Sequence, residues 1–241
     1  MIRNSTSTGH VINVANFETL IAFCVSYKDV YQPGNALISL NALRDKAKQA
    51  REILADCNVK RTAYQNAVGA RIEAFKELKP LATRIISGVS VSGVSSQTME
   101  GARSINRRIQ GKRLKTRKLA EEQGLKTISG SQLSYDTRIS NLDSLIQFVS
   151  SHPEYQPNEP FMKPDGLRQF SKELKALYDA VGASENPWFS ARVARDKILY
   201  SPEDGLVRLA AMVKDYLRSV FGAADPAFAE INHLQFRTLM H

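Results

Sequence analysis

The densest cluster of side chains able to do chemistry in this sequence is basic and lies between residues 101 and 118, GARSINRRIQGKRLKTRK. It contains no Asp or Glu, and its eight cationic residues are Arg103, Arg107, Arg108, Lys112, Arg113, Lys115, Arg117 and Lys118. Guanidinium and ammonium groups displace counterions from phosphates, which gives affinity for RNA or DNA without sequence preference. The cluster has no aromatic side chain on which a base can stack. Two interpretations therefore stand, a nucleic-acid-binding arm and a solvated or protein-contacting helical arm.

The net charge of +9 is concentrated in the first half and the middle of the chain. Residues 1–84 carry 12 basic and 7 acidic groups, residues 85–130 carry 9 and 3, and residues 131–241 carry 12 and 14. A positive field of this kind attracts nucleic acid, an anionic membrane surface or an acidic protein. The charge thus restricts the class of partner and says nothing about the fold.

Residue types that commonly perform catalysis or hold cofactors are scattered along the chain. The four histidines are His10, His152, His233 and His241. None lies three or four residues from another, so a helical pair of metal ligands is absent. The sequence also lacks the glycine-rich phosphate loops, the nucleophile elbow and the zinc-protease motif. We therefore expect no enzyme activity, no cofactor, no metal and no small-molecule substrate.

The composition is that of an ordinary globular protein, with 43% hydrophobic and 24% charged residues. The N-terminal stretch MIRNSTSTGHVINVANF has no apolar run long enough for a signal peptide, and no eighteen consecutive apolar residues occur. Cys24 and Cys57 have neither metal-ligand spacing nor redox-pair spacing. We expect a cytoplasmic protein with reduced thiols and without a membrane span.

Two parts of the chain resemble each other at an offset of 124 or 125 residues. NFETLIAFCV (16–25) corresponds to NLDSLIQFVS (141–150), YQPGN (31–35) to YQPNE (155–159), and ARIEAF (70–75) to ARDKIL (194–199). An offset that stays constant over some sixty residues indicates an internal repeat. The two cysteines align with Val149 and Val181, so we expect both thiols to be small buried apolar groups.

Each half is expected to contain three helices. The first carries apolar residues at helical spacing, namely Phe17, Leu20, Ile21 and Cys24 in one half and Leu142, Leu145, Ile146 and Val149 in the other. A Tyr-Gln-Pro turn and a longer helix follow. The clearest third helix is predicted from about Pro202 to Phe221, with Ser201 as its N-cap, Asp204 completing a capping box and Gly222 ending it.

No segment shows sustained alternation, so we predict an all-α protein: two pseudo-equivalent three-helix repeats that form an elongated helical bundle, with a basic helical insert between them. The expected boundaries are 1–90 for the first repeat, 91–130 for the insert and 131–241 for the second repeat. The insert helix carries one apolar stripe, formed by Met99, Ala102, Ile105 and Ile109. GVSVSGVSSQ (88–97) and TISGSQLS (127–134) are rich in Ser and Gly and are predicted to be loops.

Two further sets of residues allow a binding role. Tyr31 and Tyr155 occupy equivalent turns, where they either present paired contacts to one ligand or pack the corner and donate their hydroxyls to a carbonyl. Arg71, Arg192 and Arg195 either hold an anion within the bundle or pair with carboxylates such as Glu73 and Asp196.

The single tryptophan, Trp188 in NPWFSAR, is expected to anchor the end of a helix in the core.

Several short motifs, taken together, are similar to a family of uncharacterised helical proteins of about 240 residues from Bacteroidetes-type bacteria. They are NFETLI, the two YQP turns, RRIQG (107–111), QLSYD (132–136), YQPNE (155–159), SARVARD (190–196) and the final GLV and FGA. The resemblance covers nearly the whole chain. It implies a bacterial protein of one helical architecture and carries over no catalytic or binding residues.

The leading hypothesis is a non-enzymatic protein that holds RNA or DNA without sequence specificity through the basic arm at residues 103–118. The alternative is a self-assembling structural or scaffold protein, a ring or filament, whose basic arm docks on the acidic second half of a neighbouring subunit. The partners expected are therefore nucleic acid or further copies of the chain.

Overall fold

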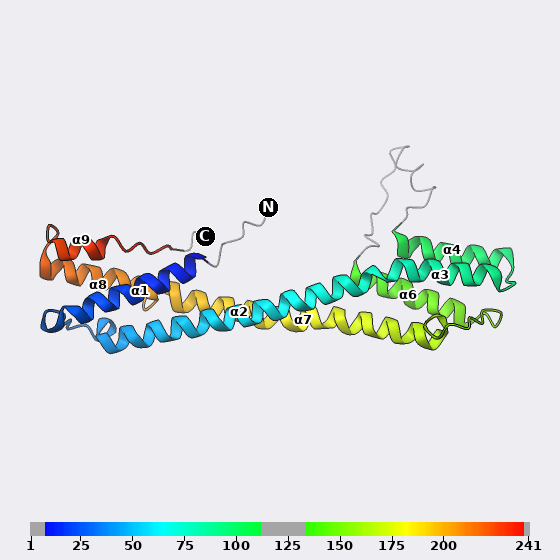
Figure 1. The fold of residues 1–241 in the computed structure, drawn as a ribbon, viewed down its shortest axis with the longest axis horizontal. Coiled ribbons are helices and arrows are strands. Elements are labelled where there is room, and N and C mark those ends of the chain that lie inside the picture. Colours follow the sequence, from blue (N-terminus) through cyan, green and yellow to red (C-terminus); the bar gives the residue numbers. More distant parts are fainter. Residues whose placement is uncertain (1–7, 112–133, 239–241) are drawn as a thin grey trace, which may run out of the picture. The chain divides into compact units, whose positions relative to one another are not determined.

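A computed structural model describes residues 8–111 and 134–238 of the chain (Figure 1). Every regular element within these residues is a helix, so the all-α prediction is confirmed. None of the helices in the described ranges combines the length and the apolar character needed to cross a membrane.

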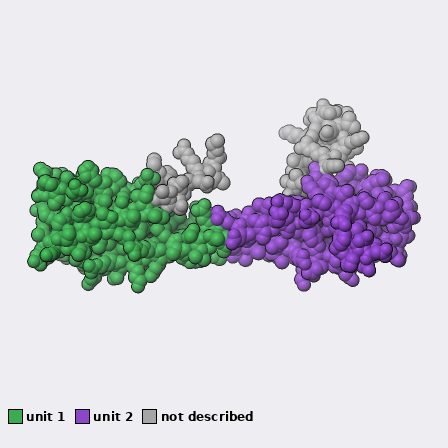
Figure 2. All heavy atoms as spheres, viewed as in Figure 1, with its two compact units in different colours: residues 1–63, 185–241 green, residues 64–184 purple. Residues whose placement is uncertain are grey.

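The helices form two compact units, which Figure 2 shows in different colours. Unit 1 comprises residues 1–63 and 185–241, and unit 2 comprises residues 64–184. Two helices of 37 residues, α2 (Leu40–Lys76) and α7 (Pro164–Tyr200), each belong partly to one unit and partly to the other. A helix of that length rises about 55 Å, more than the diameter of a small domain. These compact units divide the chain after residues 63 and 184, which differs from the boundaries at residues 90 and 130 expected for the repeats and the insert.

Unit 1 contains α1 (Thr8–Ser26), the short 3-10 helices η1 (Lys28–Val30) and η2 (Ala36–Ile38), α8 (Leu206–Phe221) and α9 (Pro226–Asn232). α8 lies against α1, α9 and η2, and its apolar face fills the core together with α1 and the first turns of α2. The fully buried side chains of this core include Phe17, Leu20, Cys24, Leu43 and Leu209.

Unit 2 contains α3 (Leu78–Val91), α4 (Ser96–Gln110), α6 (Tyr135–Ser150) and the 3-10 helix η3 (Pro160–Met162). α3, α4 and α6 pack against one another (Figure 1). The core that they enclose also takes side chains from the ends of both long helices, and its fully buried members include Leu78, Ile85, Ile109, Leu145 and Leu174.

The two tyrosines of the Tyr-Gln-Pro turns are buried and hold the corners that precede the long helices. Tyr31 Oη donates to Ile38 O at 2.6 Å, and Tyr155 Oη donates to Met162 O at 3.1 Å. Burial raises the pKa of Tyr155 to about 12, and the pKa of Tyr31 is raised for the same reason. The interpretation of both tyrosines as corner residues that bind a carbonyl is confirmed.

The predicted start of the last long amphipathic helix is wrong by four residues. α8 begins at Leu206, and residues 202–204 form a turn in which Ser201 Oγ donates to Asp204 Oδ1 at 2.7 Å. The turn brings the backbone back on itself, so that a Cβ added at Gly205 would lie 2.4 Å from Ser201 N. Only glycine fits there. The predicted helix end is confirmed, because Gly222 is the C-cap at a φ of 89°.

Two other local predictions need correction. The Ser/Gly-rich stretch 88–97 is largely helical, since α3 continues to Val91 and α4 starts at Ser96. Gly88 lies close to the Tyr155 ring, where an added Cβ would stand 3.1 Å from the ring. Trp188 does not anchor a helix end. It lies half-buried in the interior of α7, with the Arg192 guanidinium 5.3 Å from its ring centroid.

Both cysteines are buried thiols, as the alignment with valines predicts. Burial raises the pKa of Cys24 to about 12 and also raises the pKa of Cys57. A thiol that stays protonated far above neutral pH is a poor nucleophile and a poor metal ligand. Both thiols are therefore buried packing groups, and Cys24 lies in the core of unit 1.

Candidate anion-binding surfaces

The helix that opens the predicted basic arm is part of the core of unit 2. Ser95 caps α4 by accepting a hydrogen bond from Thr98 N at 3.1 Å, and Gly111 ends it at a φ of 73°. Ala102 and Ile109 are fully buried against α3 and α6, and the remaining members of the predicted apolar stripe are partly buried in the same cluster. α4 is therefore a packed helix rather than a detached arm.

Three of the eight predicted nucleic-acid-binding residues lie on α4, and an acidic neighbour offsets part of their charge. Arg103 Nη1 is 2.8 Å from Glu100 Oε1, and Arg107 Nη2 is 3.9 Å from the other oxygen of the same carboxylate. Arg108 is exposed and has no partner among the described residues. The other five, Lys112, Arg113, Lys115, Arg117 and Lys118, lie outside the described residues.

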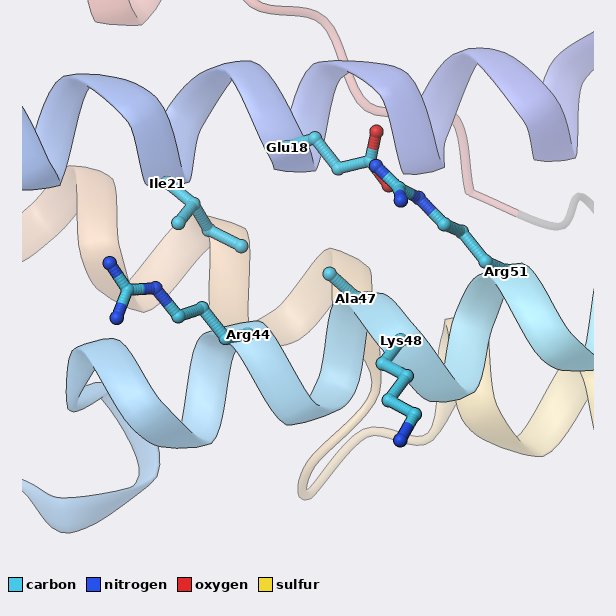
Figure 3. A pocket seen from close by; sticks show the side chains of 6 residues that line it. All are labelled: Glu18, Ile21, Arg44, Ala47, Lys48 and Arg51. Carbon is cyan, nitrogen blue, oxygen red and sulfur yellow. The ribbon is translucent and has the colours of Figure 1, made fainter.

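A second cationic surface, absent from the sequence predictions, lines a pocket of about 330 Å³ between α1 and α2 in unit 1 (Figure 3). Its lining residues are Glu18, Ile21, Arg44, Ala47, Lys48 and Arg51. The three cations follow one another at i, i+4 and i+7, which places them along one side of α2 over about 10 Å. Ile21 and Ala47 are buried and form the apolar floor.

Within the described residues, one of these three cations has a protein partner. Arg51 reaches from α2 to Glu18 on α1 and forms an ion pair with its carboxylate (Figure 3). Arg44 and Lys48 are exposed and have no hydrogen-bond or ion-pair partner in the described part of the chain. Three cations and one carboxylate leave the pocket with a formal charge of +2.

Unit 2 has a pocket of about 350 Å³ between α6 and α7, with a lining of the same kind: Asp143, Ile146, Gln147, Arg168, Ser171, Lys172 and Lys175. Asp143 Oδ1 accepts a hydrogen bond from Ser171 Oγ at 2.5 Å. Arg168 donates to Asp165 Oδ1 at 2.6 Å and to Ser150 Oγ at 3.1 Å. Lys172 and Lys175 are exposed and without a partner among the described residues.

The linings of the two pockets correspond in the sequence at the offsets of the internal resemblance. Glu18 and Ile21 lie 125 residues before Asp143 and Ile146, and the four residues of α2 lie 124 before their counterparts on α7. Over the 37 positions of α2 and α7 the paired identities are Leu43/Leu167, Arg44/Arg168, Lys48/Lys172, Ala67/Ala191, Ala70/Ala194 and Arg71/Arg195. Comparing the polar positions of the two halves would have found this charge pattern from sequence.

The arginines that were considered as anion ligands inside the bundle have protein partners. Arg195 donates to Asp196 Oδ1 at 2.6 Å, as predicted. Arg71 does not pair with Glu73; its guanidinium stacks 4.0 Å from the Tyr135 ring centroid, whereas Glu73 pairs with Lys76. These arginines therefore contribute to the packing of the helices.

A buried polar cluster in unit 1 involves His10, whose Nδ1 lies 2.7 Å from Tyr200 Oη. Burial lowers the pKa of His10, and the positive charge of Arg195 lowers it further. Asn13 beside it binds the C-terminal segment through both its amide nitrogen and its oxygen, each 2.8 Å from the backbone of Arg237. The cluster ties the C-terminal segment to α1.

The described residues contain no group of three or more His, Cys, Asp or Glu side chains that could hold a metal ion. Comparisons of the chain with family models, with curated proteins and with solved structures gave no match.

Proposed function

We propose that this chain is a non-enzymatic protein that binds RNA or DNA without sequence preference through the basic segment at residues 103–118. The observation that carries the proposal is the seating of α4. Its apolar stripe is fixed in the core of unit 2, so that Arg103 and Arg108 are exposed on a rigid helix at the start of the cluster. Because the helix is rigid, less conformational entropy is lost when its cations bind phosphates.

The charge of this segment is only partly neutralised. Glu100 offsets Arg103 and Arg107, and the five basic residues that follow α4 in the sequence have no acidic residue among them. Because contacts to phosphates carry little base information, binding should be insensitive to sequence and sensitive to salt.

The test is fluorescence polarisation of labelled single-stranded RNA and DNA at several salt concentrations. If most of the eight cations contact phosphates, the slope of log affinity against log salt is on the order of −5 to −7. A variant with all eight changed to Gln should lose binding. Arg208→Gln/Arg218→Gln, which removes two exposed charges from α8, is the control and should retain it. Absence of binding at low salt, or salt-independent binding, would reject the function.

A second candidate is a self-assembling scaffold, and one observation favours it. Phe189 and Val193, one turn apart on α7, are 61% and 54% exposed. Neighbouring exposed apolar side chains mark surfaces for association. Light scattering over a dilution series should then show assemblies that Phe189→Ser/Val193→Ser disperses. A concentration-independent monomer of 26.8 kDa excludes this candidate.

We also propose that the two halves are repeats of one helical unit. Three features support this reading: the long helices are of equal length and start 124 residues apart, the tyrosine corners make the same hydrogen bond, and the pocket linings correspond. On this reading α1, α2 and α3 correspond to α6, α7 and α8, and the basic segment lies between the copies.

A further inference from the structure

The two cationic pockets are separate from the basic segment of α4, and nothing in the proposed nucleic-acid binding requires them. We propose that each pocket binds one small anion that carries two or more phosphate groups. The chain would then hold two such ligands, one in each unit. This departs from the expectation that no small molecule binds, and it uses the duplication of the chain as its starting point.

Retention of charge at exposed positions is the first argument. The two long helices share six identical pairs. Three are Leu or Ala, and a fourth, Arg71/Arg195, is half-buried and bound to protein partners. Arg44/Arg168 and Lys48/Lys172 are exposed instead, so packing gives no reason for their identity. Arg51/Lys175 conserves the charge at a third position. A solvated face needs charge for solubility but no fixed residue at a fixed place.

The state of the cations is the second argument. In each pocket the carboxylate is already engaged, by Arg51 in unit 1 and by Ser171 in unit 2. Two cations per pocket remain without a partner among the described residues: Arg44 and Lys48 in one, Lys172 and Lys175 in the other. Neighbouring like charges on one helix repel each other, and an anion that binds both removes that repulsion.

The shape and lining of the pockets select the kind of anion. Volumes of about 330 and 350 Å³ lie at the small end of ligand sites. Cations one turn apart are separated by about 6 Å along the helix, which suits an anion with more than one charged group. No lining residue is aromatic, so no base can stack there, and the carboxylate in each lining disfavours a continuing phosphate chain. A compact oligophosphate therefore fits better than a nucleic-acid strand.

The pockets are expected to differ in affinity. Arg44 has no partner in the described part of the chain, whereas its counterpart Arg168 forms an ion pair with Asp165. The pocket of unit 1 thus offers a free guanidinium, which can bind phosphate oxygens through two parallel hydrogen bonds. The pocket of unit 2 offers two lysines, which act as point charges. We expect the pocket of unit 1 to bind its anion more tightly than the pocket of unit 2.

Isothermal titration calorimetry with inorganic tripolyphosphate, in low salt and without other phosphate, tests this proposal on the full chain. The native chain should bind two equivalents. Arg44→Gln/Lys48→Gln should lower the affinity of the tighter site for tripolyphosphate at least tenfold, and Lys172→Gln/Lys175→Gln should do the same at the weaker site. The combined variant should lose this affinity at both sites. The exposed positions predict unchanged melting temperatures, which circular dichroism verifies.

Two controls separate this proposal from a general effect of charge and from the proposed nucleic-acid binding. Arg208→Gln/Arg218→Gln removes the same charge as either double variant and should keep both sites. A single-stranded oligonucleotide should bind the combined pocket variant as well as it binds the native chain. Equal losses in the control and in the pocket variants overturn the proposal, as does tripolyphosphate binding that survives in the combined variant. Loss of oligonucleotide binding in the pocket variants, with no tripolyphosphate binding by the native chain, also overturns it.

Discussion

In unit 1 the pocket carboxylate of Glu18 is held by a cation, Arg51, whereas in unit 2 the carboxylate of Asp143 accepts a hydrogen bond from the hydroxyl of Ser171. The cations that have no partner within residues 8–111 and 134–238 differ accordingly. Each long helix carries three pocket cations in succession. The cations without a partner are the first and second of them in unit 1, Arg44 and Lys48, and the second and third in unit 2, Lys172 and Lys175. The individual pairings differ, while each lining contains three cations and one carboxylate. The difference indicates that the total charge, rather than one ion pair, is the shared property.

The units differ more strongly in the helix that completes their cores. α4 has 15 residues and buries its stripe between α3 and α6, whereas α9 in unit 1 has 7 residues and buries Phe228 and Ile231. Unit 2 should therefore depend on the helix of the basic segment for its stability.

The largest effect is expected from Ile109→Ala in α4. Removing a fully buried aliphatic side chain leaves a cavity and should lower the free energy of unfolding by about 2–5 kcal/mol. Urea denaturation followed by circular dichroism measures it. Val91→Ala, at a side chain that is 85% exposed, is the control and should change stability by less than about 0.5 kcal/mol. Equal stability of the two variants would show that α4 is not part of the core.

Tyr31→Phe and Tyr155→Phe compare the two corners directly. Each change leaves a buried carbonyl, of Ile38 or of Met162, without its donor and should cost about 1–3 kcal/mol. The same denaturation assay applies. Because the corners lie in different units, the double variant should show the sum of the two losses. A loss at only one corner would contradict their equivalence.

Acid should destabilise unit 1 through His10, for which unit 2 has Tyr135 at the corresponding position. The lowered pKa means that the folded state binds fewer protons than the unfolded state. The stabilisation is therefore present above the ordinary pKa of about 6.5 and is lost as the pH falls through the lower folded value, with a slope of at most about 1.4 kcal/mol per pH unit. Urea titrations between pH 7 and pH 5 should show this slope, and His10→Gln should reduce it. An unchanged slope in the variant would assign the acid sensitivity to other groups.

The smallest effect concerns the pocket carboxylates. Glu18→Gln removes a negative charge and frees Arg51, so tripolyphosphate should bind unit 1 about two to five times more tightly, in line with the modest strength of an exposed ion pair. Asp143→Asn frees no cation and should have a smaller effect on unit 2. Glu52→Gln, an exposed position of α2 outside the lining, serves as the control for calorimetry. Weaker binding after Glu18→Gln would mean that the carboxylate itself contacts the ligand.

The parts of the structure that sequence could predict are those determined by local pattern. Apolar residues at helical spacing predicted the helices, and the Tyr-Gln-Pro turns predicted the two corner hydrogen bonds. The alignment of Cys24 with a valine predicted its burial. The start of α8 was missed because serine is a typical N-cap residue and Ser201 precedes the apolar pattern. The close backbone approach that requires glycine at position 205 leaves no periodic pattern in the sequence.

Features that depend on distant packing could not be read in the same way. The stripe on α4 was visible, but only the structure shows that α3 and α6 cover it. The pockets were missed because Arg44 and Lys48 resemble any charged face of a helix, and their significance depends on which carboxylates lie opposite. The division into units follows from helices too long for one core, a property that hydrophobic periodicity does not reveal.

The two units are built from different stretches of the chain, and this affects the order in which they can fold during synthesis. Unit 2 is one continuous stretch of chain, residues 64–184, whereas unit 1 needs residues 1–63 together with residues 185–241. During synthesis α1 and the start of α2 emerge before α8 and must wait for it before their apolar faces are covered, while unit 2 can close as soon as its own residues have left the ribosome. Contacts between segments so far apart form slowly. α1 is thus made well before it is buried, and the nascent chain exposes Phe17, Leu20 and Cys24 until α8 has been made.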